Sequence, residues 1–172
     1  MRAEFQITPE WISLYRRAFP EQEQYPVTML KILQRRKDIS AVTFVEDNQF
    51  VGLLYFTETA ETIFVLFLAV DDTLRSGGYG SKILTWLKEY ADGRPICLNI
   101  EPEDPEADNA EQRRRRIAFY RKNGIVPTGY YLGAQGQVYA ACSSAEKFDP
   151  EAYRKAMARL SLGLYAPRPY QN

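Results

Sequence analysis

The sequence predicts an α/β fold in which helices flank a mixed, mostly antiparallel sheet. The strand-like segments lie at 39–45, 50–56, 63–70, 96–100, 128–132 and 137–142. The first three follow one another through short turns, so we expect them to be antiparallel neighbours. A helical pattern at 81–90 separates the third from the fourth, and this connection fits a parallel crossover. The last two form a hairpin around the Gly-rich turn at 133–136.

The N-terminal region predicts a short strand at 5–7, followed by two helices. Thr8 is a suitable N-cap and Pro9 suits the first helical position, so a helix is expected over 9–19. Apolar residues at helical spacing predict the second helix at 26–36.

Two more helices follow in the second half of the chain. One is expected over 110–123, ended by Gly124 as its C′ residue. The other begins at Asp149 and carries an apolar face made of Tyr153, Ala156, Met157, Leu160 and Leu164. We expect the tail at 166–170 to be mobile. The predicted organisation is one domain over 1–145, with the C-terminal helix and tail of 146–172 packed on it.

Composition excludes several classes of function. The 172 residues contain 22 basic and 22 acidic side chains, and this balance argues against a nucleic-acid-binding protein. No apolar run approaches the roughly 20 residues of a membrane span, and the N-terminus lacks a signal-peptide core. There is no histidine, which removes histidine-based catalysis and histidine-ligated zinc, and we expect no metal. We expect Cys97 and Cys142 to be reduced core thiols of a cytoplasmic protein.

A glycine-rich stretch between the strand at 63–70 and the next helix is the most informative part of the sequence. Its three glycines lie within four residues, at 77, 78 and 80, directly before a helix N-terminus. Glycines allow close backbone approach, and free N–H groups of a helix start bind anions, so the stretch predicts a pyrophosphate cradle. Gly80-Ser81-Lys82 has the wrong order for a Walker A motif, and Ile83 takes the last glycine place of the dinucleotide fingerprint.

Two motifs resemble those of the GNAT N-acetyltransferases. Arg75-Ser76-Gly77-Gly78-Tyr79-Gly80 fills every required place of their acetyl-CoA signature, Arg/Gln-x-x-Gly-x-Gly/Ala. The run from Phe119-Tyr120 to Gly124-Ile125 is similar to their Phe-Tyr-x-x-x-Gly-Phe helix end. The resemblance covers roughly 5–142 and implies the GNAT fold, whose parallel strands splay apart around the pantetheine arm of acetyl-CoA.

The resemblance also implies which residues hold acetyl-CoA as co-substrate. The backbone at the end of the strand before the loop would bind pantetheine, and the loop and helix start would bind the pyrophosphate. The expected cofactor-binding residues are Leu68, Ala69, Val70, Arg75, Ser76, Gly77, Gly78, Tyr79, Gly80, Ser81 and Asn109. Asn109 is included because Arg113 stands where the family often has a CoA-contacting asparagine.

For catalysis, the resemblance makes Tyr120 the general acid that protonates the leaving thiolate. A backbone N–H near Leu68 would bind the developing oxyanion. Some members carry a glutamate base on the strand before the loop, but Phe64 stands there. Glu101 is the first candidate for the base, and Glu61, Glu58 or a chain of waters are the alternatives.

The function that follows is transfer of an acetyl group from acetyl-CoA to a primary amine of a small molecule or peptide in a ternary complex. The alternatives are a non-catalytic sensor of CoA or acyl-CoA, and transfer of a longer acyl group. The acidic loop at 101–108 hints at a cationic acceptor such as a polyamine, an aminoglycoside or a lysine side chain. We expect the arginines at 113–116 to pair with this loop and the CoA phosphates rather than nucleic acid, and a homodimer stays open.

Overall fold

The computed structural model of the chain describes residues 1–134, 136–161 and 166–171. In this part of the chain eight strands form one sheet in the order β1-β2-β3-β4-β5-β7-β6-β8. The strands are β1 (Arg2–Glu4), β2 (Ile39–Glu46), β3 (Gln49–Glu58), β4 (Ile63–Val70), β5 (Ile96–Ile100), β6 (Val126–Ala134), β7 (Gln137–Ser143) and β8 (Tyr170–Gln171). Only the central pair, β4 and β5, is parallel, so the predicted mixed sheet is confirmed.

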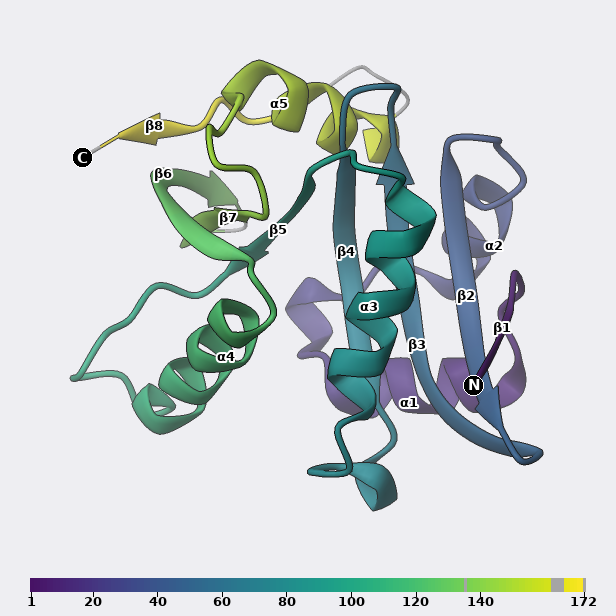
Figure 1. Cartoon of the computed structure of the whole chain (residues 1–172). Helices are drawn as coiled ribbons and strands as arrows, with labels where there is room; N and C mark the ends of the chain where they lie inside the picture. Colours follow the sequence, from purple (N-terminus) through teal and green to yellow (C-terminus); the bar gives the residue numbers. More distant parts are fainter. Residues whose placement is uncertain (135, 162–165, 172) are drawn as a thin grey trace.

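Helices cover both faces of this sheet (Figure 1). The helices are α1 (Pro9–Ala18), α2 (Val27–Leu33), α3 (Tyr79–Ala91), α4 (Ala110–Lys122) and α5 (Pro150–Ala158), with short 3₁₀ turns η1 (Glu21–Glu23), η2 (Asp72–Leu74) and η3 (Arg159–Ser161). One buried core packs α1, α2 and α5 on one face, and a second packs α3 and α4 on the other. None of the helices among the described residues has the length and apolarity that a membrane crossing requires.

The N-terminal strand lies earlier than predicted. It is β1, paired with β2, and not the segment 5–7. The chain leaves the sheet edge after Glu4, where the N–H of Gln6 turns back to the Glu4 carbonyl at 2.8 Å. Phe5 then packs outside the sheet against Trp86, with ring centroids 5.9 Å apart.

The first two helices largely follow the prediction. Thr8 caps α1 by accepting a hydrogen bond from the N–H of Trp11 at 3.2 Å. Helix α2 is shorter than the expected 26–36, because the N–H groups of Arg35 and Arg36 bond three residues back and tighten the last turn.

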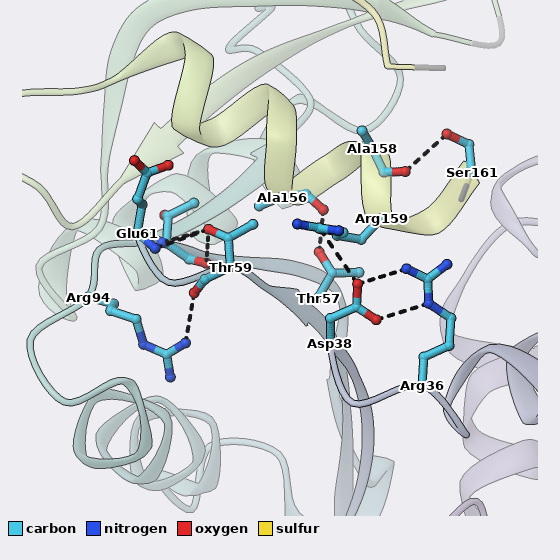
Figure 2. Close-up of polar contacts among 11 residues, drawn as sticks. Arg36, Asp38, Thr57, Thr59, Glu61, Arg94, Ala156, Ala158, Arg159 and Ser161 are labelled. Atoms are coloured by element: carbon cyan, nitrogen blue, oxygen red, sulfur yellow. Dashed lines mark hydrogen bonds and ion pairs between the residues drawn. The ribbon is translucent and has the colours of Figure 1, made fainter. Parts of the chain in front are cut away.

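The C-terminal segment packs on the same face as α1 and α2. Figure 2 shows two of its attachments: Thr57 in β3 donates to the Ala156 carbonyl at 2.6 Å, and Asp38 pairs with Arg159 at 3.5 Å. The predicted apolar face of α5 is buried, whereas Leu164 lies outside the described residues, as does Gln135 in the hairpin turn. The tail at 166–170, predicted to be mobile, leads into β8, and this strand pairs with β6. The division of the chain at residue 145 stays a prediction.

Candidate active site

The parallel strands β4 and β5 separate halfway along their length. They pair only at Ile63 with Ile96, Phe64 with Cys97 and Val65 with Leu98. Strand β4 continues for five more residues, to Val70, and remains paired with β3. Its edge toward β5 therefore carries backbone N–H and C=O groups without a strand partner, which suits an extended ligand that adds itself as a strand.

A β-bulge at Leu66 explains where the strands separate. Tyr55 pairs with Phe67 and Phe56 with Val65, so Leu66 is an extra residue in β4. A bulge bends its strand and increases the local twist. The side-chain alternation shifts here, because Leu66 and Phe67 both pack with the core beneath α1 and α2.

A cleft of about 300 Å³ lies at this opening. Its lining includes six of the residues predicted from the motifs: Leu68, Ala69, Val70, Arg75, Glu101 and Tyr120. They come from β4, the loop after it, the end of β5 and α4. The other predicted residues, 76–81 and Asn109, are not part of the lining.

The glycine loop forms the start of α3 beside the cleft. The turn η2 ends with the N–H of Gly77 bonded to the Leu74 carbonyl at 3.2 Å. Gly78 is the N-cap of α3 with a φ of 78°, and the helix begins at Tyr79 rather than at the predicted Ser81. Within the described residues the N–H groups of Tyr79, Gly80 and Ser81 have no protein partner. Such groups, at the positive end of the helix dipole, can bind an anion.

Arg75 and its neighbours fix this loop to α1. The Arg75 side chain, 64% exposed, pairs with Asp72 at 2.5 Å. Arg17 in α1 binds the same carboxylate at 2.7 Å and Asp71 at 2.8 Å. The Arg75 guanidinium is thus held at the cleft, with further N–H groups for a ligand.

The side chain of Tyr79 has a structural contact. Its hydroxyl donates to Glu46 at the end of β2, at 2.7 Å. This hydrogen bond, the N-terminal ammonium of Met1 and Lys82 lower the pKa of Glu46 to about 2. The predicted role of Tyr79 in cofactor binding therefore depends on its backbone N–H.

Tyr120 faces the cleft from α4 with an unengaged hydroxyl. Within the described residues this hydroxyl has no hydrogen-bond partner. Burial raises the pKa of Tyr120 to about 12, an effect that Arg116 partly offsets. The helix ends just after it, with Gly124 at a φ of 72° and the Ile125 N–H bonded to the Tyr120 carbonyl at 2.9 Å. This cap confirms Gly124 as the C′ residue.

Glu101 is surrounded by cations. Its two carboxylate oxygens pair with Arg113 at 3.1 Å and Arg116 at 2.9 Å, and both are also within reach of the Asn109 amide. Asn109 in turn accepts from Arg113 at 2.7 Å. These contacts tie α4 to the end of β5 and occupy both carboxylate oxygens of Glu101. Its role as base stays a prediction.

The alternative bases lie away from the cleft. Glu58 pairs with Arg94 at 2.6 Å and accepts from the Tyr90 hydroxyl at 2.7 Å. Glu61 lies 3.9 Å from Lys155. Neither carboxylate is among the residues that line the cleft.

Comparison with known proteins decides the family. The sequence model described as the acetyltransferase (GNAT) family matches residues 8–125. The chain belongs to this family. No curated protein matches the chain.

Solved structures share the GNAT fold. A protein of Bacteroides thetaiotaomicron described as a GNAT-family acetyltransferase is 24% identical with a TM-score of 0.71, covering 94% of this chain and 96% of its own. An aminoglycoside 6′-N-acetyltransferase complexed with coenzyme A is 17% identical with a TM-score of 0.63, covering 87% and 100%. A Bacillus subtilis acetyltransferase in complex with CoA is 14% identical with a TM-score of 0.58, covering 83% and 96%.

This GNAT domain has a second cavity that the motifs did not predict. It measures about 410 Å³ and is lined by residues of the core beneath α1, α2 and α5. It shares six lining residues with the cleft: Glu23, Val65, Leu66, Phe67, Asn99 and Tyr139. The two spaces therefore adjoin at the point where β4 and β5 separate.

Glu23 is the functional candidate that sequence reasoning missed. It lies in η1, between α1 and α2, in a polar stretch that looks like an ordinary surface turn. Its position becomes clear only when β7 places Tyr139 beside it, with the hydroxyl donating to Oε1 at 3.0 Å. A contact across 116 residues leaves no signal in local spacing.

The two cysteines do not contribute a nucleophile. Both are free and buried, at 3% and 0% exposure for Cys97 and Cys142. Burial raises the pKa of Cys97 and brings that of Cys142 to about 12. Both thiols therefore stay protonated near neutral pH.

Proposed function

We propose that this chain is an acetyl-CoA-dependent N-acetyltransferase that acts on a primary amine by direct attack in a ternary complex. The observation that carries the proposal is the opening between β4 and β5, where a free strand edge, Arg75 and Tyr120 line one cleft and the start of α3 follows Arg75 closely along the chain. The CoA complexes of structural neighbours support it.

The residues present fit the co-substrate. The strand edge at 68–70 offers backbone partners for the two amides of pantetheine. The unpartnered N–H groups of Tyr79, Gly80 and Ser81, with the Arg75 guanidinium, suit a pyrophosphate. Ser76, Gly77 and Gly78 then shape the loop, and Asn109 acts indirectly, by holding Arg113.

The reaction needs an activated carbonyl, which the thioester of acetyl-CoA supplies. The amine lone pair forms a C–N bond at the carbonyl carbon as the C–S bond breaks, the nitrogen loses one proton and the sulfur gains one. A backbone N–H near Leu68 stabilises the oxyanion. With a pKa of about 12, Tyr120 stays protonated and donates to the leaving thiolate. A thiol has a pKa near 8.5, so Tyr120 stabilises the leaving thiolate chiefly by a hydrogen bond, and the proton that the sulfur finally gains comes from water.

The amine must be neutral before it attacks. Because two arginines occupy the oxygens of Glu101, we assign this carboxylate to the attachment of α4 to β5. The proton then leaves through water at the mouth of the cleft, one of the routes left open by the sequence.

The test is release of CoA thiol from acetyl-CoA in the presence of a panel of primary amines. We expect amine-dependent release that Tyr120→Phe lowers by about 10- to 100-fold in kcat, the effect of losing one hydrogen bond to a charged group. Tyr170→Phe is the matched control, since Tyr170 lies at the exposed sheet edge. If acetyl-CoA binds but no amine of the panel causes release of CoA thiol, the result would contradict the proposed enzymatic activity and favour the non-catalytic sensor.

Three broader expectations are part of the same proposal. We propose a cytoplasmic location, which two free buried cysteines support. We also propose that 146–172 belong to the same folding unit as 1–145, because Thr57 and Asp38 bind α5 and η3. Homodimer formation stays a prediction.

A further inference from the structure

We infer that the second cavity binds the acceptor, and that the acceptor is a monoamine with an apolar body whose ammonium group binds Glu23. This inference rests on the proposed function and names its substrate class. It goes beyond the family, because it depends on side chains particular to this chain.

The cavity is placed correctly for an acceptor. It lies on the face of α1, α2 and α5, whereas the glycine loop and α4 lie on the other side of the β4–β5 opening. Phe64, Leu66 and Phe67 form its floor along β4. Because Glu23 lines both spaces, an ammonium bound to it lies beside the cleft, where it loses one proton to water before the neutral amine attacks the thioester.

The side chains that line the cavity suit a ligand that has one positive charge and is otherwise apolar. Most of the lining is apolar or aromatic, and includes Tyr25, Met29, Leu132, Met157 and Leu160. Among the described lining residues, Glu23 is the only one with a charged side chain. One half-buried carboxylate in such a cavity matches a ligand with one positive charge, since a charge that loses water needs a partner.

Glu23 is fixed in place and can accept hydrogen bonds from a ligand. Its N–H bonds to the Pro20 carbonyl at 2.9 Å, and the next residue, Gln24, binds the carbonyl of Phe19 at 2.7 Å, which locks η1 onto the end of α1. The Tyr139 hydroxyl holds Oε1 at 3.0 Å. Within the described residues Glu23 has no ion-pair partner, so Oε2 and the remaining lone pairs can receive an ammonium.

The far wall of the cavity is attached to the sheet. Met157 and Leu160 lie on α5 and η3, the segment that Figure 2 shows bound to Thr57 of β3 and to Asp38 just before β2. Thr57 binds the Ala156 carbonyl at 2.6 Å, and Asp38 bridges Arg159 at 3.5 Å and Arg36 at 2.7 Å. These contacts hold the wall in position before a ligand binds, which reduces the entropic cost of binding.

The same lining disfavours polycations. The acidic loop had suggested a polyamine or an aminoglycoside, but its exposed carboxylates, at 103, 104, 106 and 108, line neither space. Glu101 already pairs with Arg113 and Arg116. A second ammonium inside the cavity would lose its water without gaining a carboxylate, and that is costly.

The first experiment compares 2-phenylethylamine with spermidine and kanamycin as acceptors in the thiol-release assay. We expect kcat/KM for 2-phenylethylamine to exceed that for both polycations by at least about tenfold, the effect of one misplaced charge. A higher kcat/KM for either polycation would overturn the inference while leaving the acetyltransferase proposal intact.

The second experiment removes the charge of Glu23. Glu23→Gln should lower kcat/KM for 2-phenylethylamine by about 10- to 100-fold, mainly through KM, as expected for a lost charged hydrogen bond. Glu21→Gln, which neutralises an exposed carboxylate in the same turn outside the cavity, should change it less than twofold. Equal effects of both variants would overturn the assignment of Glu23.

A binding measurement tests the inference independently of catalytic turnover. 2-Phenylethylamine and its uncharged analogue 2-phenylethanol are titrated calorimetrically into the protein with saturating CoA. We expect the amine to bind more tightly in the wild type, and Glu23→Gln to remove that preference. Failure of CoA itself to bind would refute the proposed function, whereas CoA binding without amine binding would refute only this inference.

Discussion

Gly80 in α3 lies so close to Phe119 in α4 that a side chain at position 80 would collide with the ring. An added Cβ would be 2.9 Å from the Phe119 Cζ atom. The glycine thus lets α3 and α4 approach each other. As a result the motif at 75–80 and the motif at 119–125 lie in contact.

Gly80→Ala should therefore destabilise the protein. Overpacking typically costs about 1–3 kcal/mol, which exceeds the gain of up to about 1 kcal/mol from helix propensity. Chemical denaturation measures the change. The double variant Gly80→Ala, Phe119→Leu should recover part of the loss, because leucine lacks the atoms that collide. A single variant as stable as the wild type would show that the helices do not meet as described.

The cysteines should be unreactive in the folded protein. Cys97 and Cys142 are buried and their pKa values are raised, that of Cys142 to about 12. At pH 8 a disulfide reagent such as Ellman's reagent should modify neither thiol on the timescale of the transfer assay, and both after unfolding. Rapid modification of the native protein would contradict the burial of these residues.

The Glu46 carboxylate should make stability depend on pH in acid. Its pKa is lowered from 4.5 to about 2 in the folded protein, first by the Tyr79 hydroxyl. Its stabilising contribution is therefore complete above pH 4.5 and is lost as the pH falls through about 2. The difference in melting temperature between wild type and Glu46→Gln should be constant at neutral pH and shrink across this window. Glu89→Gln, which changes an exposed carboxylate on α3, is the control variant for this comparison.

Tyr153 should position Asn99 at the junction of the two spaces. The buried Tyr153 hydroxyl donates to Oδ1 of Asn99 at 2.6 Å. Tyr153→Phe leaves that oxygen unpaired, so we expect a loss of about 1–3 kcal/mol in the free energy of unfolding. If Asn99 also orients the ligands, kcat should fall while the KM for acetyl-CoA stays within about twofold. An unchanged stability would contradict the hydrogen bond.

Much of the fold follows from local signals in the sequence. Strand alternation, the Thr8 cap and the Gly124 C′ residue each act within a few residues, so the pattern predicts them well. Apart from shifted bounds of α2 and α3, the exceptions lie at the chain ends. The first strand and β8 are short, and each exists through pairing with a distant strand, β2 or β6, that local pattern does not encode.

The residues of the candidate site likewise fall into those that local motifs predict and those that only long-range contacts place. The glycine loop and Tyr120 could be predicted because contiguous motifs carry them. The partners of Glu101 could be predicted only in part, since Arg113 and Arg116 bind it while Arg114 and Arg115 pair with Glu111. The pairing of Glu23 with Tyr139 could not be predicted, because it forms only when η1 and β7 meet.

The central claim is that the loop before α3 binds the pyrophosphate of acetyl-CoA, and calorimetric titration tests it most directly. Acetyl-CoA is titrated into the wild type, Gly78→Glu and the control Gly93→Glu. Both glycines have positive φ, 78° and 82°, and open space around the added Cβ, so backbone strain is matched. We predict micromolar binding to the wild type and Gly93→Glu, and a loss of at least about tenfold in Gly78→Glu, where a carboxylate faces the phosphates. Equal affinities for all three proteins, or no binding to the wild type, would contradict the account.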